Sequence, residues 1–232
     1  MQFANRITAE IENQILEKLN GSGLVADPFP YIYIEDFLPK SLFDYIVSIM
    51  PEDRYLSPFS DKKYVTHTKP IPNKILLTIY NSSIKYLELD GVPHREEIIN
   101  LHKWYSSFLK KAIANKLQVS LDNEKDDDLL YNIDTPGFFK VPHTDTPQKI
   151  FSALLYITNS KVGTSIHRPI DTTFTDSVGY DLPPRMFNKI FTTEHKPNNM
   201  FAFVRTDNSF HSVEKLSSDE RRVGLHYAVR RK

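Results

Sequence analysis

The chain has 232 residues, of which 40% are hydrophobic and 25% are charged, and this balance is typical of a soluble globular protein. The 29 basic and 29 acidic residues give a formal net charge of zero, which argues against a nucleic-acid partner or a membrane-surface partner. The chain has no cysteine, and this excludes disulfides, thiolate metal sites, iron–sulfur clusters and cysteine nucleophiles. Neither a long apolar run nor the apolar stretch of a signal peptide is present, so we expect a cytoplasmic protein without a membrane span.

The first half of the chain carries mainly helical patterns. Apolar residues recur at helical spacing over residues 7–19, where Thr8 is a plausible N-cap, and a β-rich stretch follows at 31–34. A second helix is expected over about residues 40–50, because a proline follows it directly. The longest helical pattern covers residues 95–117, and its apolar side chains form one stripe that should pack on a sheet.

The second half of the chain differs, with short runs rich in Tyr, Phe, Ile and Val separated by Pro, Gly, Asn and Asp. This pattern predicts a sandwich or barrel of short strands. Because helices come first and strands second, we expect an α+β protein with an antiparallel β core and helices on one face. Residues 51–73 and 158–186 are predicted to be loops, the second a candidate active-site loop. The predicted strands cover residues 129–133, 137–141, 150–157, 187–193, 200–205, 209–214 and 222–229.

The most informative pattern is the pair His143 and Asp145. In an extended chain these two side chains point to the same face, so an imidazole and a carboxylate can take adjacent positions on one metal ion. A histidine from a later strand would complete a two-His, one-carboxylate facial triad, which leaves coordination positions open, and His211 is the candidate. His167 and His195 are rivals, but neither precedes a strand that begins with an arginine. The alternatives are a surface turn for the first pair and a hydrogen-bonded core histidine for His211.

A His-x-Asp pair, a distal histidine and an arginine about ten residues later resemble the iron(II)/2-oxoglutarate-dependent oxygenase superfamily, and especially its prolyl-hydroxylase-like branch. The agreement is wider than these residues, because the stretches 28–39, 131–145, 163–169 and 198–214 resemble corresponding segments of such enzymes. The resemblance covers most of the chain. It implies a double-stranded β-helix, a jelly-roll of two sheets that encloses the site, with the N-terminal and central helices packed outside on the larger sheet.

The resemblance also implies an activity and a set of cofactors. Iron(II) would be held by His143, Asp145 and His211, with 2-oxoglutarate and O2 as co-substrates and ascorbate supporting activity. The expected reaction is hydroxylation of a C–H bond in a small metabolite, an amino acid or a peptidyl residue. Related halogenases have a small residue where this chain keeps Asp145, so hydroxylation or desaturation is favoured over halogenation. We expect one domain, in which residues 1–127 supply helical support and a substrate loop and residues 128–232 form the metal-binding β core.

Two other classes remain open at this point. One is a cupin-type metalloenzyme that does not use 2-oxoglutarate; it would usually carry a His-x-His pair, which this chain lacks. The other is a non-catalytic jelly-roll binding protein, in which a ligand would be missing or the pocket blocked.

Two consecutive arginines, Arg221 and Arg222, stand at the start of the last predicted strand. A 2-oxoglutarate held at one end by iron needs a cation for its far carboxylate, and arginine suits this role through its bidentate fork. Arg221 shares its face with a row of apolar residues that should lie under the helices, whereas Arg222 shares its face with Gly224 and leaves room for a ligand. Arg222 is therefore the predicted anchor, and Arg221 is expected to pair with Asp219 or Glu220. A register shift of one residue would exchange the two arginines.

Five further residues are candidates for ligand binding. Tyr131 lies on the strand that leads into the metal motif, where similar enzymes often have a hydroxyl that donates to the co-substrate; a core tyrosine is the alternative. Asn132 and Lys149 are candidates of the same kind. Arg168 and Arg185, in the predicted loop, are candidates for binding a substrate carboxylate, and exposed loop arginines are the alternative.

Overall fold

The computed structural model describes residues 3–59 and 73–232, in which the strands form two antiparallel sheets. The strands are β1 (Tyr31–Ile34), β2 (Ser57–Pro58), β3 (Lys74–Tyr80), β4 (Glu124–Asp134), β5 (Lys140–His143), β6 (Lys149–Tyr156), β7 (Ser165–Pro169), β8 (Phe187–Thr192), β9 (Met200–Val204), β10 (His211–Val213) and β11 (Arg222–Arg231). The larger sheet has seven strands in the order β1-β9-β6-β11-β4-β3-β2, and the smaller has four in the order β5-β10-β7-β8. Strands that are neighbours in a sheet are mostly distant in the sequence, so each sheet is assembled from several parts of the chain.

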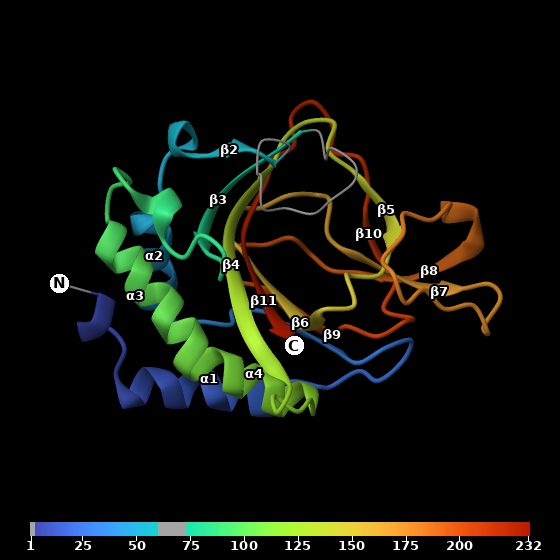
Figure 1. Cartoon of the computed structure of the whole chain (residues 1–232), viewed down its shortest axis with the longest axis horizontal. Coiled ribbons are helices and arrows are strands. Elements are labelled where there is room, and N and C mark those ends of the chain that lie inside the picture. The colour runs from blue at the N-terminus through green and yellow to red at the C-terminus, as the bar shows by residue number, and fades with distance from the viewer. Residues whose placement is uncertain (1–2, 60–72) are drawn as a thin grey trace.

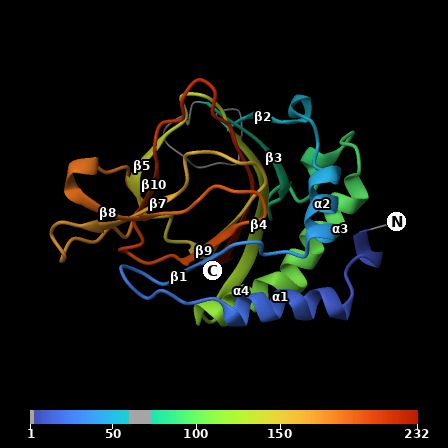
Figure 2. The ribbon, with the colours of Figure 1, turned by 180° about the vertical axis from the view of Figure 1, so that it is seen from behind.

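The longer helices form a layer on one side of the larger sheet, and the smaller sheet lies on the other side (Figures 1 and 2). They are α1 (Ala9–Gly21), α2 (Lys40–Ile49), α3 (Arg95–Trp104), a π-helical turn (Tyr105–Leu109) and α4 (Lys110–Leu117). Short 3-10 helices are Phe3–Asn5, Asp53–Tyr55, Leu87–Leu89 and Pro184–Met186. None of the helices in the two described stretches combines the length and apolar character that crossing a membrane would require.

The ends of the helices follow local sequence signals. Thr8 caps α1 as predicted, because its side-chain oxygen accepts a hydrogen bond from the Ile11 backbone N–H at 3.3 Å. The predicted helix over 95–117 is continuous only in part, since the π-helical turn separates α3 from α4. In this turn the Ser106 hydroxyl donates to the Asp127 carboxylate on β4 at 2.6 Å. The π-helical turn therefore brings a polar contact into the layer between helix and sheet.

The main hydrophobic core lies between the helices and the outer face of the larger sheet. On β11 this core contains Val223, Leu225, Tyr227 and Val229, which alternate with residues of the inner face. This is the apolar row that strand alternation predicts to lie under the helices. Burial of this row fixes which face of β11 is turned toward the smaller sheet.

A second, smaller cluster lies on the inner face, between the two sheets. It is mainly aromatic and contains Phe29, Tyr31, Tyr156, Ile166, Phe201 and Phe203. The Phe203 ring also contacts the imidazole of His211, with ring centroids 4.6 Å apart. The apolar lining of the interior therefore reaches as far as the polar residues described below.

Each of the seven predicted strands overlaps an observed strand, and the structure differs from the prediction in three places. The predicted loop 158–186 contains strand β7, which pairs with β10 and β8 and joins the smaller sheet. Strand β3 was not predicted from the sequence, although it pairs with β4 along nearly its whole length. The predicted loop 51–73 begins with the Asp53–Tyr55 turn and β2, and its part from 60 to 72 lies outside the described residues.

Candidate metal centre

The pairing of β5 with β10 brings the predicted metal ligands together. His143, the last residue of β5, is the register partner of His211, the first residue of β10. Asp145 follows β5 by two residues, and one potential ligand atom from each of the three side chains lies within 4.8 Å of the others. The two imidazole centroids are 4.3 Å apart. The structure thus assembles the predicted triad, and it is the sole such His, Cys, Asp or Glu group within residues 3–59 and 73–232.

Backbone carbonyls fix the orientation of both imidazoles. The Nδ1–H of His143 donates to the Val141 carbonyl at 2.9 Å, and the Nδ1–H of His211 donates to the Ser209 carbonyl at 3.0 Å. Because a carbonyl can only accept, the proton resides on Nδ1 and the Nε2 lone pair is free. Burial lowers the pKa of both histidines, and for His143 the neighbouring His211 and Lys140 lower it further. Both rings are therefore neutral near pH 7 and suited to bind a metal through Nε2.

The Asp145 carboxylate is bound at one of its two oxygens. Oδ2 accepts a hydrogen bond from the Ser152 hydroxyl at 2.7 Å and lies 3.0 Å from the Lys149 ammonium. Burial alone would raise the pKa of Asp145, but the Lys149 charge holds this pKa well below its usual range. Two neutral imidazoles and one ionised carboxylate are a donor set that fits a non-haem iron(II) ion.

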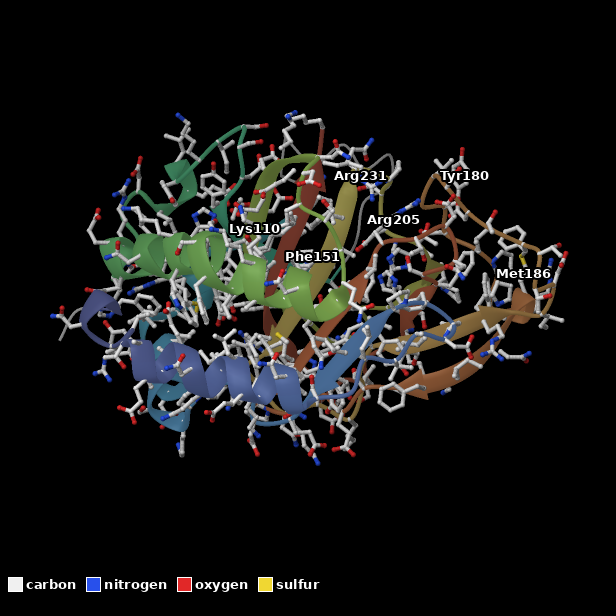
Figure 3. The ribbon with its side chains drawn as sticks, turned by 90° about the horizontal axis from the view of Figure 1, so that it is seen from below. Lys110, Phe151, Tyr180, Met186, Arg205 and Arg231 are labelled. Carbon is white, nitrogen blue, oxygen red and sulfur yellow. The ribbon has the colours of Figure 1, made fainter. Side chains whose placement is uncertain are left out.

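A loop that follows β7 packs against the backbone of the metal motif. Arg205, which is buried, donates from Nε to the Asp145 carbonyl at 3.1 Å and from Nη2 to the Ser177 carbonyl at 2.8 Å. The Asp176 carboxylate accepts backbone N–H groups of this loop, and a Cβ at Gly179 (φ 91°) would lie 3.1 Å from the Thr144 carbonyl. Figure 3 labels Arg205 and, farther out, Tyr180 of the same loop. The sequence carries no local signal for Arg205, because the carbonyls of Asp145 and Ser177 belong to segments that are distant from it in the chain.

Arg222 lies on the inner face, as alternation predicts, and only 4% of it is exposed. Its Nε donates to His195 Nδ1 and its Nη2 donates to the Thr164 hydroxyl, both at 3.3 Å. Nη1 lies 3.5 Å from an oxygen of Asp134, which Lys74 also contacts at 2.8 Å. Nη1 is buried and has no hydrogen-bond partner among the described residues. A buried guanidinium with a free donor group is suited to bind an anionic ligand.

The rival histidines lie elsewhere. His195 stacks on Tyr156, with ring centroids 4.1 Å apart, and burial together with the Arg222 charge lowers its pKa to about 2. His167 forms a hydrogen bond with the Ser212 hydroxyl at 2.7 Å, and burial lowers its pKa to about 4. Neither histidine belongs to the triad.

Tyr131 and Asn132 point to opposite faces of β4. Asn132 is the register partner of Gly224 on β11, and its buried side-chain oxygen has no hydrogen-bond partner among the described residues. Asn132 therefore shares the inner face with Arg222. Tyr131 lies in the core under the helices, so the prediction that its hydroxyl reaches the co-substrate is wrong. Strand alternation is the physical reason, since adjacent residues cannot both face the interior.

The remaining predicted arginines have other partners. Arg221 forms a two-pronged ion pair with Asp53, at 2.8 and 2.5 Å, which corrects the expected pairing with Asp219 or Glu220. Arg168 on β7 is paired with Asp27.

Arg185 is exposed in the short helix before β8, next to Met186 at the outer end of the β7–β8 hairpin (Figure 3). A role in substrate binding stays a prediction for both Arg168 and Arg185.

No family model matches the sequence, and no curated protein matches it either. Solved structures do match. A prolyl-4-hydroxylase from Pseudomonas putida is 17% identical with a TM-score of 0.52, covering 96% of this chain and 100% of that one. A 2OG-Fe(II) oxygenase family oxidoreductase from Burkholderia pseudomallei is 12% identical with a TM-score of 0.53, covering 95% and 90%. SnoK, a non-haem α-ketoglutarate (2-oxoglutarate) dependent carbocyclase from nogalamycin biosynthesis, is 9% identical with a TM-score of 0.55, covering 100% and 86%. The chain therefore has the fold of the iron(II)/2-oxoglutarate-dependent oxygenases.

Proposed function

We propose that this chain is an iron(II)- and 2-oxoglutarate-dependent oxygenase that hydroxylates a C–H bond of a small molecule or a peptidyl residue. The observation that carries the proposal is the triad of His143, Asp145 and His211, with its ligand atoms within 4.8 Å of one another and both Nε2 lone pairs free. The chain that carries this triad also has the fold of such oxygenases.

The strand order supports a double-stranded β-helix as the core. From β4 to β11, the strands β4, β6, β9 and β11 belong to the larger sheet, and β5, β7, β8 and β10 belong to the smaller. The chain thus crosses repeatedly between the sheets, as in a jelly-roll. Strands β1 and β3 of the first half pair with β9 and β4 of the second half, which supports one domain for the whole chain.

The residues of the site have separate tasks in this proposal. When bound, iron(II) with 2-oxoglutarate and O2 supplies the oxidising chemistry. His143, Asp145 and His211 would hold the ion through one ligand atom each, and such a set of three leaves room for further ligands. Arg222 binds the far carboxylate of 2-oxoglutarate through the donor group at Nη1, and Asn132 lines the same face. The aromatic cluster between the sheets excludes water from this end of the interior.

The ionised carboxylate of Asp145 favours oxygenation over halogenation, because it occupies the position that a halide would need. Other oxidative outcomes occur on this fold, since the similar structures include a carbocyclase and an epimerase, SnoN. A cupin-type enzyme without 2-oxoglutarate would have no use for a buried cation with a free donor, so Arg222 separates the two proposals.

The test uses the two consecutive arginines as a matched pair. We expect wild-type protein with iron(II), O2 and ascorbate to convert 2-oxoglutarate slowly to succinate and CO2 without substrate. Arg222→Ala should raise the KM for 2-oxoglutarate by about 100-fold, because it removes a buried charged partner. Arg221→Ala removes an exposed ion pair with Asp53 and should leave the KM within about threefold. Equal effects of the two variants, or no succinate from wild-type protein that binds the metal, would contradict the proposal.

A further inference from the structure

A buried lysine, Lys149, lies beside Asp145 of the candidate metal centre. We infer that Lys149 restricts Asp145 to binding the metal through a single oxygen and offsets the charge of that carboxylate. The consequence is a site that holds a metal ion less tightly on its own but keeps that ion more attractive to an anionic co-substrate. This inference rests on the proposed function and concerns the same site.

The side-chain contacts of Asp145 all involve one carboxylate oxygen, Oδ2. The Lys149 ammonium lies 3.0 Å from Oδ2 and also donates to the Ser152 hydroxyl at 3.2 Å, and this hydroxyl donates to the same Oδ2 at 2.7 Å. Both donors therefore occupy one oxygen, and Oδ1 is the oxygen left for a metal. Lys149 is 8% exposed and Ser152 is fully buried, so water competes little with these contacts.

An irregularity in β6 explains why Lys149 faces inward. On β11, Val229 is the register partner of Phe151, but Arg230 is the partner of Lys149, so Ile150 is the extra residue of a bulge. Without the bulge, residues 149 and 152 would point to opposite faces of the strand. With it, Ile150 and Phe151 both lie in the core under the helices, and Lys149 joins Ser152 at the triad.

The charge of the lysine matters because the triad has little charge of its own. Its two histidines are neutral, so Asp145 supplies the one negative charge that attracts a metal cation. A lysine in contact with this carboxylate cancels most of the attraction, and it also repels a divalent ion a few ångströms away in a poorly hydrated interior. For the same reason, a metal bound there keeps more of its positive charge for a dianion such as 2-oxoglutarate.

The direction in which metal affinity changes when Lys149 is removed distinguishes this role from a structural one. If Lys149 only held the fold or oriented Asp145, its removal would weaken metal binding. If it offsets the carboxylate charge, its removal should strengthen binding of the metal alone by about tenfold. Binding of an anionic co-substrate analogue to the metal-loaded protein should weaken by a similar factor.

The experiment measures Mn2+ affinity of the full chain by electron paramagnetic resonance, without any co-substrate. We expect Lys149→Met to bind Mn2+ about tenfold more tightly than wild type and Lys149→Arg to stay within about threefold of it. Lys149→Gln keeps a donor for Oδ2 but lacks the charge; it should behave like the Met variant and replaces it if that variant does not fold. Lys110→Met is the matched control, because Lys110 lies on helix α4 in the helical layer outside the larger sheet (Figure 3), where it is paired with Glu124 of β4. The Mn2+ affinity of this variant should equal that of wild type.

A second titration adds N-oxalylglycine, an inert analogue of 2-oxoglutarate, to the Mn2+-loaded proteins. We expect its dissociation constant to rise in Lys149→Met. Mn2+ binding that is weaker than or equal to wild type in both Lys149→Met and Lys149→Gln would overturn the inference. If wild type binds Mn2+ but not N-oxalylglycine, the proposed function fails, and the titrations with metal alone still decide the role of Lys149.

Discussion

The two faces of strand β11 differ in what they contact. The outer face carries Val223, Leu225 and Tyr227, which pack under the helices, whereas the inner face carries Arg222 and His226 among the polar residues of the site. Each face comes from every second residue of one strand. Residues that stabilise the fold and residues that line the site therefore alternate along the same strand, and they differ in the face of the sheet they occupy rather than in their position along the chain. Changes on the inner face should therefore alter binding, and changes on the outer face should alter folding.

The largest effect is expected at the triad. His211→Ala removes one of three metal ligands from the inner side, and we expect Mn2+ affinity to fall by more than about 100-fold and succinate formation to be lost. The midpoint of urea unfolding without metal should change little, because the His211 ring is not part of the main core. Metal binding can be followed by isothermal titration calorimetry. Retained tight binding would show that the three side chains do not share an ion.

The outer face is tested by Leu225→Ala. Leu225 is 1% exposed in the main core, and its truncation should lower the free energy of unfolding by about 3 kcal/mol. Urea titration followed by circular dichroism measures this loss. The folded variant should keep the Mn2+ affinity of wild type, since the side chain points away from the triad. A large change in metal affinity in the folded variant would mean that the two faces are coupled.

A smaller effect is expected from Asp127, a charged group on the outer face. Burial alone would raise the pKa of Asp127, but hydrogen bonds from His102, Ser106 and Tyr227 lower it to about 2. Because the folded-state pKa lies below the ordinary value of 3.8, the contribution of Asp127 to stability is complete above pH 3.8 and is lost as the pH falls toward 2. We expect this pH-dependent part to be about 1 to 2 kcal/mol.

The variant Asp127→Asn provides the measurement. The difference in unfolding free energy between wild type and Asp127→Asn should be constant from pH 7 to about 5 and should shrink below about pH 4. Urea titrations over this range measure it. A difference that stays constant down to pH 2.5 would rule out an ionised Asp127 as the source.

Local rules gave much of the site from the sequence. Two-residue spacing placed His143 and Asp145 on one face, and alternation distinguished Arg222 from Arg221. The same alternation makes Tyr131 and Asn132 mutually exclusive as site residues, so the error at Tyr131 was avoidable. Strand β7 escaped detection because it is short and lies between glycine- and proline-containing segments.

Other features depend on tertiary structure and carry no local signal. The contact of Lys149 with Asp145 requires the bulge at Ile150, which arises from the pairing of β6 with β11. Arg205 binds carbonyls of two segments that meet only in the folded chain, and Arg221 finds Asp53 rather than its acidic neighbours in sequence. The fold class could be predicted because helix and strand patterns are local, whereas these partners could not.

The glycine at position 179 limits how the protein can change over evolutionary time. A side chain there would be strained by the positive φ and would press on the carbonyl of Thr144, the residue between His143 and Asp145, so a substitution at this position would disturb the backbone of the metal motif. The neighbours Val178 and Tyr180 are 50% and 63% exposed and meet no such barrier. Substitutions of these two side chains can therefore change the surface beside the metal motif without the contact that a side chain at Gly179 would make.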